Sequence, residues 1–255
     1  MVKIKRTKEE GKYSMEDLLA IMKALRAPDG CPWDIEQTHK SIRNDLLEEA
    51  YEVADAIDTD DDTALCEELG DLLLQVVFHS EIASEDSAFD YSDVVDGIAR
   101  KLVLRHPHVF GTAKADNSSE VLDLWDDIKK EEKHQSTATE TLKSVPRAFP
   151  ALMRSAKVQK RATKAGLSLY DPVASGALIN LCYGLENAMA NGDKSSAAES
   201  YGELLFALSR VGKLIGADPE ETLNAATDSF IKDFERVENE ALKENIPLKD
   251  VLENI

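Results

Sequence analysis

Two pairs of acidic residues in the first third of the chain have a spacing that could hold a metal ion. Glu49 and Glu52 are three residues apart, and so are Glu68 and Asp71. On an α-helix this spacing places both members of a pair on one face, about one turn apart. The second pair leads into the apolar run 72–78, which predicts a helix buried on most sides. Carboxylates on such a helix need a partner that balances their charge.

A divalent cation shared by two neighbouring antiparallel helices would be such a partner. Two carboxylates about 4 Å apart repel by roughly 4 kcal/mol at an effective dielectric constant of 20. Four of them would take up protons or separate unless a cation offset the repulsion. Oxygen ligands suit Mg²⁺, with Mn²⁺ as a substitute, and both ions bind phosphate oxygens. The four positions contain no histidine or cysteine, which disfavours zinc. The pattern therefore predicts a magnesium site in a helical bundle that binds a polyphosphate.

Each pair taken alone has a simpler interpretation. Glu48, Glu49 and Glu52 could form the solvated face of a surface helix whose opposite face is apolar. Glu68 and Asp71 could be acids in a first helical turn, where the helix dipole favours negative charge. The combination of the two pairs with the apolar run favours the metal site.

Cationic and aromatic residues farther along the chain could bind the rest of a nucleotide. Lys101 and Arg105 are four residues apart at the end of a predicted helix, so they could clamp a phosphate or could be surface cations favoured by the helix dipole. Trp125 and Lys129 have the same spacing in a helix predicted over 121–132. Trp125 could pack in the protein or could stack on a nucleobase, a contact that tolerates any base.

The segment 31–39 precedes the first acidic helix and carries an aromatic and an imidazole side chain. We interpret Trp33 and His39 as packing and capping residues. Their position beside the acidic pairs leaves a pocket-lining role open.

Composition indicates an all-α protein. The 255 residues include only 12 Gly and 8 Pro, and good helix formers dominate. A net charge of −19 argues against a nucleic-acid partner or an anionic membrane surface. Three widely spaced cysteines fit a reduced, cytoplasmic protein, and neither a signal peptide nor a membrane-spanning run is expected.

The pattern of helices and polar segments predicts two tandem domains. Residues 1–13 are expected to be a disordered tail, and 14–135 form the first domain. A polar, proline-containing linker over 136–149 separates it from a second domain over 150–255.

The second domain reads as a degenerate copy of the first. The segment 202–206, Gly-Glu-Leu-Leu-Phe, repeats 70–74, Gly-Asp-Leu-Leu-Leu, at an offset of 132 residues. When the two halves are aligned, the positions that correspond to the predicted site lack its chemistry. The acids Glu49, Glu52 and Glu68 correspond to Gly184, Asn187 and Ser200. The cations Lys101 and Arg105 correspond to Ser229 and Asp233. We expect no second metal site there, and interpret this domain as a scaffold, a dimer surface or a regulatory part.

Four motifs together resemble the MazG family of nucleoside triphosphate pyrophosphohydrolases. They are Gly-Cys-Pro-Trp-Asp (30–34), Glu-Glu-Ala-Tyr-Glu (48–52), Glu-Leu-Gly-Asp-Leu-Leu (68–73) and Arg-His-Pro-His-Val-Phe (105–110). The resemblance implies an all-α fold whose bundle is commonly completed by a second subunit, here a homodimer. It implies Mg²⁺-dependent cleavage between the α and β phosphates of a nucleoside triphosphate, which yields a nucleoside monophosphate and pyrophosphate.

The resemblance also implies roles for individual residues. Glu49, Glu52, Glu68 and Asp71 would hold the metal, Lys101 and Arg105 would bind phosphate, and Trp125 and Lys129 would lie near the nucleotide. Glu48 would support these ligands or orient the attacking water, so the catalytic set would be Glu48, Glu49 and Glu52. Two alternatives stay open at this point: a regulatory or partner-binding protein on a decayed fold, and a pyrophosphohydrolase of another nucleotide, such as a phosphoribosyl nucleotide.

Overall fold

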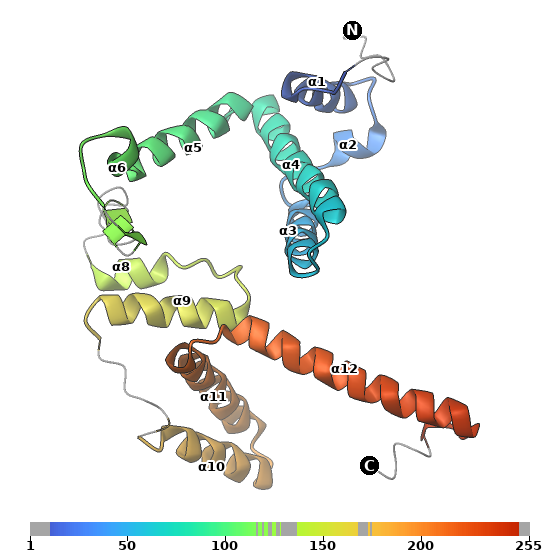
Figure 1. Ribbon diagram of the computed structural model, residues 1–255, viewed down its shortest axis with the longest axis vertical. Helices are drawn as coiled ribbons and strands as arrows, with labels where there is room; N and C mark the ends of the chain where they lie inside the picture. The colour runs from blue at the N-terminus through green and yellow to red at the C-terminus, as the bar shows by residue number, and fades with distance from the viewer. Residues whose placement is uncertain are drawn as a thin grey trace. The chain divides into compact units, whose positions relative to one another are not determined.

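The chain folds into helices that divide into two compact units, Met1–Ile128 and Lys129–Ile255 (Figure 1). The computed structural model describes residues 11–115, 117–118, 120–121, 124–125, 128, 137–167, 173 and 175–249. Within those ranges every regular element is a helix and no strand occurs, which confirms the predicted all-α class. None of the described helices is long and apolar enough to cross a membrane.

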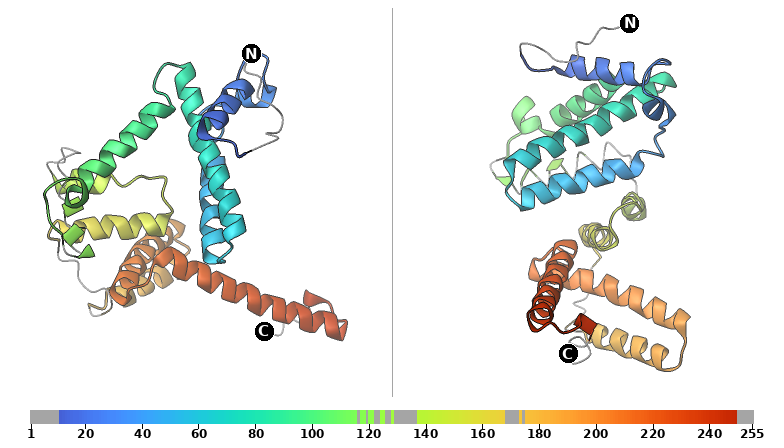
Figure 2. Two further views of the ribbon diagram at one scale, coloured as in Figure 1. Left: turned by 45° about the horizontal axis from the view of Figure 1, so that its top comes forward. Right: turned by 90° about the vertical axis from the view of Figure 1, so that its right-hand side faces the viewer.

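The first unit is built around a long helical hairpin. Its helices are α1 (Met15–Leu25), α2 (Pro32–Glu36), α3 (Arg43–Asp58), α4 (Asp62–Glu85), α5 (Tyr91–Arg105) and α6 (Pro107–Phe110). The turn between α3 and α4 is tight, because Asp60 adopts a left-handed conformation with φ of 54°. Asp61 then caps α4 by accepting hydrogen bonds from the backbone N–H groups of Thr63 and Ala64. The short connection forces α3 and α4 to run antiparallel along each other, as both views show (Figure 2).

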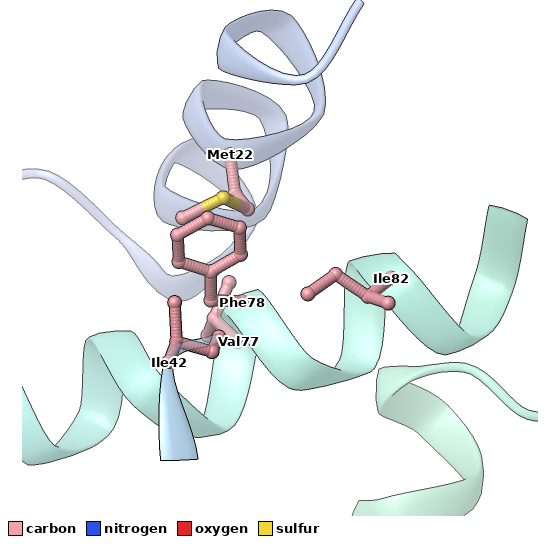
Figure 3. Packing of buried hydrophobic residues seen from close by; sticks show 5 residues of the cluster. All are labelled: Met22, Ile42, Val77, Phe78 and Ile82. Carbon is pink, nitrogen blue, oxygen red and sulfur yellow. The ribbon is translucent and has the colours of Figure 1, made fainter. Parts of the chain in front are cut away.

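A small apolar core fixes the C-terminal half of α4. Met22 of α1 points at Phe78 of α4, and Ile42 lies beside Val77 at the start of α3 (Figure 3). Ile82 extends the cluster by one more turn of α4. Because α1 crosses α4 here, this half of the helix is anchored, whereas the half that carries Glu68 and Asp71 is held mainly by α3.

The predicted burial of the apolar run 72–78 is only partly correct. Val77 and Phe78 are buried, but 72–74 are half-buried and Leu69 is 49% exposed. On α5, Val95, Ile98, Leu102 and Val103 are exposed, with Ile98 at 48%. The physical reason is that α5 contacts α4 near the turn that joins them and then diverges, so no described element covers these faces (Figure 1).

The second unit contains α8 (Ala138–Lys143), α9 (Ala151–Lys164), α10 (Ala177–Ala190), α11 (Lys194–Ile215) and α12 (Pro219–Glu244). Helix α8 lies inside the segment predicted as a linker and packs on α9. Helices α10 and α11 form a second hairpin, in which Asp193 caps α11 through the backbone N–H groups of Ser195 and Ser196. Asp193 is 132 positions after Asp61, the offset seen in the sequence repeat. That the second unit is a decayed copy of the first stays a prediction, with which this helix order agrees.

Candidate metal and nucleotide site

The α3–α4 hairpin gathers three of the four predicted metal ligands at one point. Glu49 comes from α3, and Glu68 and Asp71 come from α4. One carboxylate oxygen from each lies within 4.8 Å of the others. Among the described residues, this is the single group of three acidic, histidine or cysteine side chains so arranged. The arrangement follows from two i,i+3 pairs on antiparallel helices whose acidic faces meet.

Glu52 adjoins the same group although it is not among the three closest. Its side chain interacts with those of both Glu49 and Glu68, and its charge acts on both. All four acids predicted as metal ligands are therefore brought together by the hairpin.

Crowding of the carboxyl groups changes their acidity. The pKa of Glu49 is raised, first by partial removal from water and then by the charges of Asp71, Glu52 and Glu68. The pKa of Glu68 is raised by partial removal from water and by the charges of Glu52, Asp71 and Glu67. No lysine or arginine is among the causes of either shift. Among the described residues the cluster thus offers oxygen donors, and no lysine or arginine offsets its negative charge, which fits a hard divalent cation.

Glu48, predicted as a catalytic residue, does not join the cluster. It lines a shallow depression on α3 together with Asn44, Tyr51 and Asp55. Glu52 lies at the border of the two regions, because it lines this depression and also contacts the cluster.

The predicted phosphate-binding cations lie at the far end of α5. Asp71 precedes the end of α4 by 14 residues, or about 21 Å of helix, and Arg105 lies a similar length beyond the start of α5. Since α4 and α5 diverge from their common turn, the structure does not bring Lys101 and Arg105 to the acids of the same chain (Figure 1; Figure 2, left).

The predicted nucleotide-binding aromatic residue lies beside those cations. The ring of Trp125 packs edge-on against His106, with 4.9 Å between ring centroids. His106 directly follows Arg105, so Trp125 belongs to the α5 end of the first unit. Lys129 lies outside the described residues.

Sequence reasoning missed a buried arginine that fixes the segment before α3. The side chain of Arg26, at the end of α1, is 5% exposed and pairs with Glu85 of α4 through two contacts of 2.6 Å. It also donates to the backbone carbonyls of Asp34 and Gln37, and its guanidinium lies over the ring of Phe78. A single arginine at a helix end carries no spacing signal, so only the folded chain reveals this role.

His39 is held by a partner on α4 that the sequence did not indicate. Its Nδ1 lies 2.8 Å from Nδ1 of His79, and the two rings are stacked. The pKa of His79 is lowered by burial and by the neighbouring His39. Trp33 packs edge-on against Phe78, which agrees with its predicted packing role. Gln75 lies on α4 one turn before His79, toward the acids. It is 6% exposed, and its Oε1 has no hydrogen-bond partner within the described part of the chain.

Comparison with known proteins places the chain in a family. A family model for the MazG nucleotide pyrophosphohydrolase domain matches residues 37–110. Over 231 residues the chain is 42% identical to the nucleoside triphosphate pyrophosphohydrolase of Escherichia coli (strain K12), which covers 88% of this chain and 87% of that protein. The chain belongs to the MazG family. It is also 36% identical over 243 residues to the nucleoside triphosphate pyrophosphohydrolase/pyrophosphatase MazG of Thermotoga maritima, which covers 95% of this chain and 92% of that protein.

Family membership confirms the resemblance that the four motifs indicated. The region matched by the MazG model lies wholly in the first unit and contains both acidic pairs, Lys101 and Arg105. In this MazG chain the acids are gathered by one hairpin, whereas the cations lie on a helix that leads away from it.

Proposed function

We propose that this chain is a Mg²⁺-dependent nucleoside triphosphate pyrophosphohydrolase with its active site in the first unit. It releases a nucleoside monophosphate and pyrophosphate. The observation that carries the proposal is the convergence of Glu49, Glu68 and Asp71 within 4.8 Å on two antiparallel helices. The Escherichia coli and Thermotoga maritima relatives, both named nucleoside triphosphate pyrophosphohydrolases, support the same reaction.

The acids would hold the cation, and their own chemistry explains why they need it. Glu49, Glu52, Glu68 and Asp71 supply the oxygen ligands. The pKa values of Glu49 and Glu68 are raised by partial removal from water and by the charges of the neighbouring carboxylates, so a bound cation would relieve the repulsion in the ionised cluster. When bound, a divalent cation neutralises phosphate oxygens and lowers the pKa of a coordinated water. Glu52 adjoins the cluster, and we propose that its carboxylate accepts a proton from the attacking water.

Lys101 and Arg105 would bind the phosphates that the acids alone repel. The guanidinium of Arg105 suits a phosphate because its N–H groups can donate two parallel hydrogen bonds. Their distance from the acids of their own chain favours a homodimer in which α5 of one copy lies over the α3–α4 hairpin of the other. The exposed apolar side chains of α5 and the exposed Leu69 of α4 would be covered in the same contact.

The reaction is tested by separating the two phosphate products. The purified chain is incubated with ribo- and deoxynucleoside triphosphates and Mg²⁺, and pyrophosphate and orthophosphate are measured separately. We expect pyrophosphate and nucleoside monophosphate in equal amounts, no reaction with EDTA, and recovery with Mn²⁺. Release of orthophosphate with a nucleoside diphosphate would contradict the proposal.

A further inference from the structure

The second unit contains a cavity that the proposed reaction does not use. It lies between α9 and α11, with the end of α8 at its border, and has a volume of about 460 Å³. Volumes of this size are typical of sites for small organic molecules. From α11 it is lined by Gly202, Leu205, Phe206 and Ser209, which recur on one face of the helix.

The charge of the cavity is opposite to that of the chain. Its lining contains two basic residues, Arg154 and Lys143, and no acidic residue. The whole chain has 49 acidic and 30 basic residues, so a lining of this kind is not expected from composition. An anion would therefore find here a local attraction that the rest of the surface opposes.

Arg154 is the residue that indicates a bound ligand. Its Nε is buried and has no hydrogen-bond partner within the described part of the chain. Buried polar groups in native proteins are nearly always paired, because an unpaired donor loses its bonds to water without replacement. An oxygen supplied by a bound anion would pair it.

Two charged groups close to Arg154 in the fold have hydrogen-bond partners within the chain. Arg161, two turns along the same helix, donates to the carbonyl of Thr141 and to Oγ of Ser144, at 2.6 Å each. Glu220 of α12 reaches the start of α9, but its carboxylate accepts hydrogen bonds from the backbone N–H groups of Leu152 and Met153. The chain thus supplies partners for Arg161 and Glu220 but, within its described part, none for Nε of Arg154.

The other walls indicate the body of the ligand. Most of the lining is apolar, and Phe206 contributes a side chain that is 49% exposed. A flat ring system can stack on such a side chain, while a guanidinium favours a phosphate because it can donate two parallel hydrogen bonds. We propose that this cavity is a binding site for a small phosphomonoester with an aromatic body, of which a nucleoside monophosphate is the test case. It binds without hydrolysing, because the acids of the first unit have no counterpart group among the described residues of the second.

Isothermal titration calorimetry of the full chain with AMP in EDTA tests the site. Without a divalent cation the first unit cannot form its proposed metal complex, so binding reports on the cavity. We expect one AMP per chain, and Arg154→Gln to weaken binding at least tenfold, since hydrogen bonds to charged groups are the strong ones. Arg154→Lys, which keeps the charge but not the fork, is expected to fall between the two.

Matched variants separate this proposal from the alternatives. Arg147→Gln removes an exposed arginine of the same unit that does not line the cavity, and should bind AMP like the unmodified chain. Asp71→Asn should also bind AMP normally, even if it abolishes turnover, so that the two proposals fail independently. Phe206→Leu should weaken binding of AMP and leave binding of inorganic phosphate unchanged.

Three results would overturn the site. The first is no binding of AMP or inorganic phosphate by the unmodified chain. The second is equal AMP binding by the unmodified chain and a folded Arg154→Gln variant, with folding checked by circular dichroism. The third is a change of oligomeric state in Arg154→Gln, measured by light scattering, while AMP binding stays the same. That result would mean that the cavity belongs to an interface between copies of the chain.

Discussion

Asp71 offers the cleanest single-residue test of the acidic cluster. Replacing its carboxylate by an amide in Asp71→Asn keeps the shape of the side chain and removes one charged ligand. We expect turnover to fall by at least about a hundredfold, because phosphoryl transfer depends on positioning and charge neutralisation by the metal. Pyrophosphate release with Mg²⁺ is the measurement, and circular dichroism should show unchanged helix content.

A control on the same hairpin distinguishes this effect from a general loss of charge. Asp55→Asn changes an acid that lines the depression of α3 and is not one of the three acids that converge. It should keep nearly full turnover. Equal losses in both variants would show that the acids act through the net charge of the hairpin and that Asp71 holds no metal.

The raised pKa values of Glu49 and Glu68 predict a pH-dependent stability in the absence of metal. A carboxyl group whose pKa is higher in the folded than in the unfolded chain binds its proton more tightly when folded. Its contribution therefore favours folding below the unfolded value of about 4.3 and is lost as the pH rises through the raised pKa. In EDTA, the Tm of the unmodified chain should fall relative to that of Glu49→Gln as the pH rises from about 4 to 7.

Magnesium should reverse that difference. At pH 7 the ion binds the folded chain and raises its Tm, whereas Glu49→Gln lacks a ligand and should gain less. Differential scanning calorimetry with and without Mg²⁺ measures both effects. If the two proteins had parallel Tm curves across this pH range, the repulsion inferred for the cluster would be absent.

At the scale of elements, Arg26 ties three of them together, since it pairs with Glu85 of α4 and donates to two carbonyls around α2. Lysine keeps the charge but cannot reproduce the planar fork, so Arg26→Lys should lower the free energy of unfolding of the first unit by about 2 kcal/mol. Urea unfolding followed by tryptophan fluorescence reports on this unit alone, because both tryptophans, Trp33 and Trp125, belong to it.

Arg100 provides the matched control for Arg26. It pairs with Asp96 on the surface of α5, where both side chains are exposed. Arg100→Lys should change the free energy of unfolding by no more than about 0.5 kcal/mol, as is usual for exposed ion pairs. A cost at Arg26 as small as this would mean that segment 31–39 is held by other contacts.

The sequence was sufficient for those features that depend on local spacing. Two i,i+3 pairs on neighbouring antiparallel helices predict that their acidic faces meet, and the structure brings Glu49, Glu68 and Asp71 together on one hairpin. The position of Glu48 outside the cluster depends on how α3 is rotated against α4, which the sequence pattern does not define.

Long-range contacts could not be predicted for a different reason. Arg26 and Glu85 are 59 residues apart, and His39 and His79 are 40 apart, so no periodicity joins them. The direction of α5 could not be predicted either, because its apolar residues have the same spacing whether they face their own hairpin or that of another chain.

At the scale of the whole molecule, we expect the first unit to carry the activity and the second unit to support it. Glu203 is 132 positions after Asp71, but its surroundings in the predicted alignment lack the other acids. Glu203→Gln should therefore leave pyrophosphate release nearly unchanged under conditions in which Asp71→Asn abolishes it. A comparable loss in both variants would move the active site, or an essential part of it, to the second unit.

The divergence of α4 and α5 leads to a test of the homodimer. If Lys101 and Arg105 act on the acids of another copy, each active site needs acids from one chain and cations from its partner. An Asp71→Asn chain and a chain with both Lys101→Gln and Arg105→Gln would then be inactive as separate homodimers. Each of the two chains would nevertheless carry the part that the other lacks.

Mixing and exchanging the two variants should restore activity. Random exchange makes half of the dimers mixed, and each mixed dimer has one complete site of two, so about a quarter of the unmodified activity per chain is expected. Light scattering should show dimers for all three proteins. If activity after exchange stayed at the level of the separate variants, the cations would serve their own chain, and α5 would have to fold back onto its own hairpin when substrate binds.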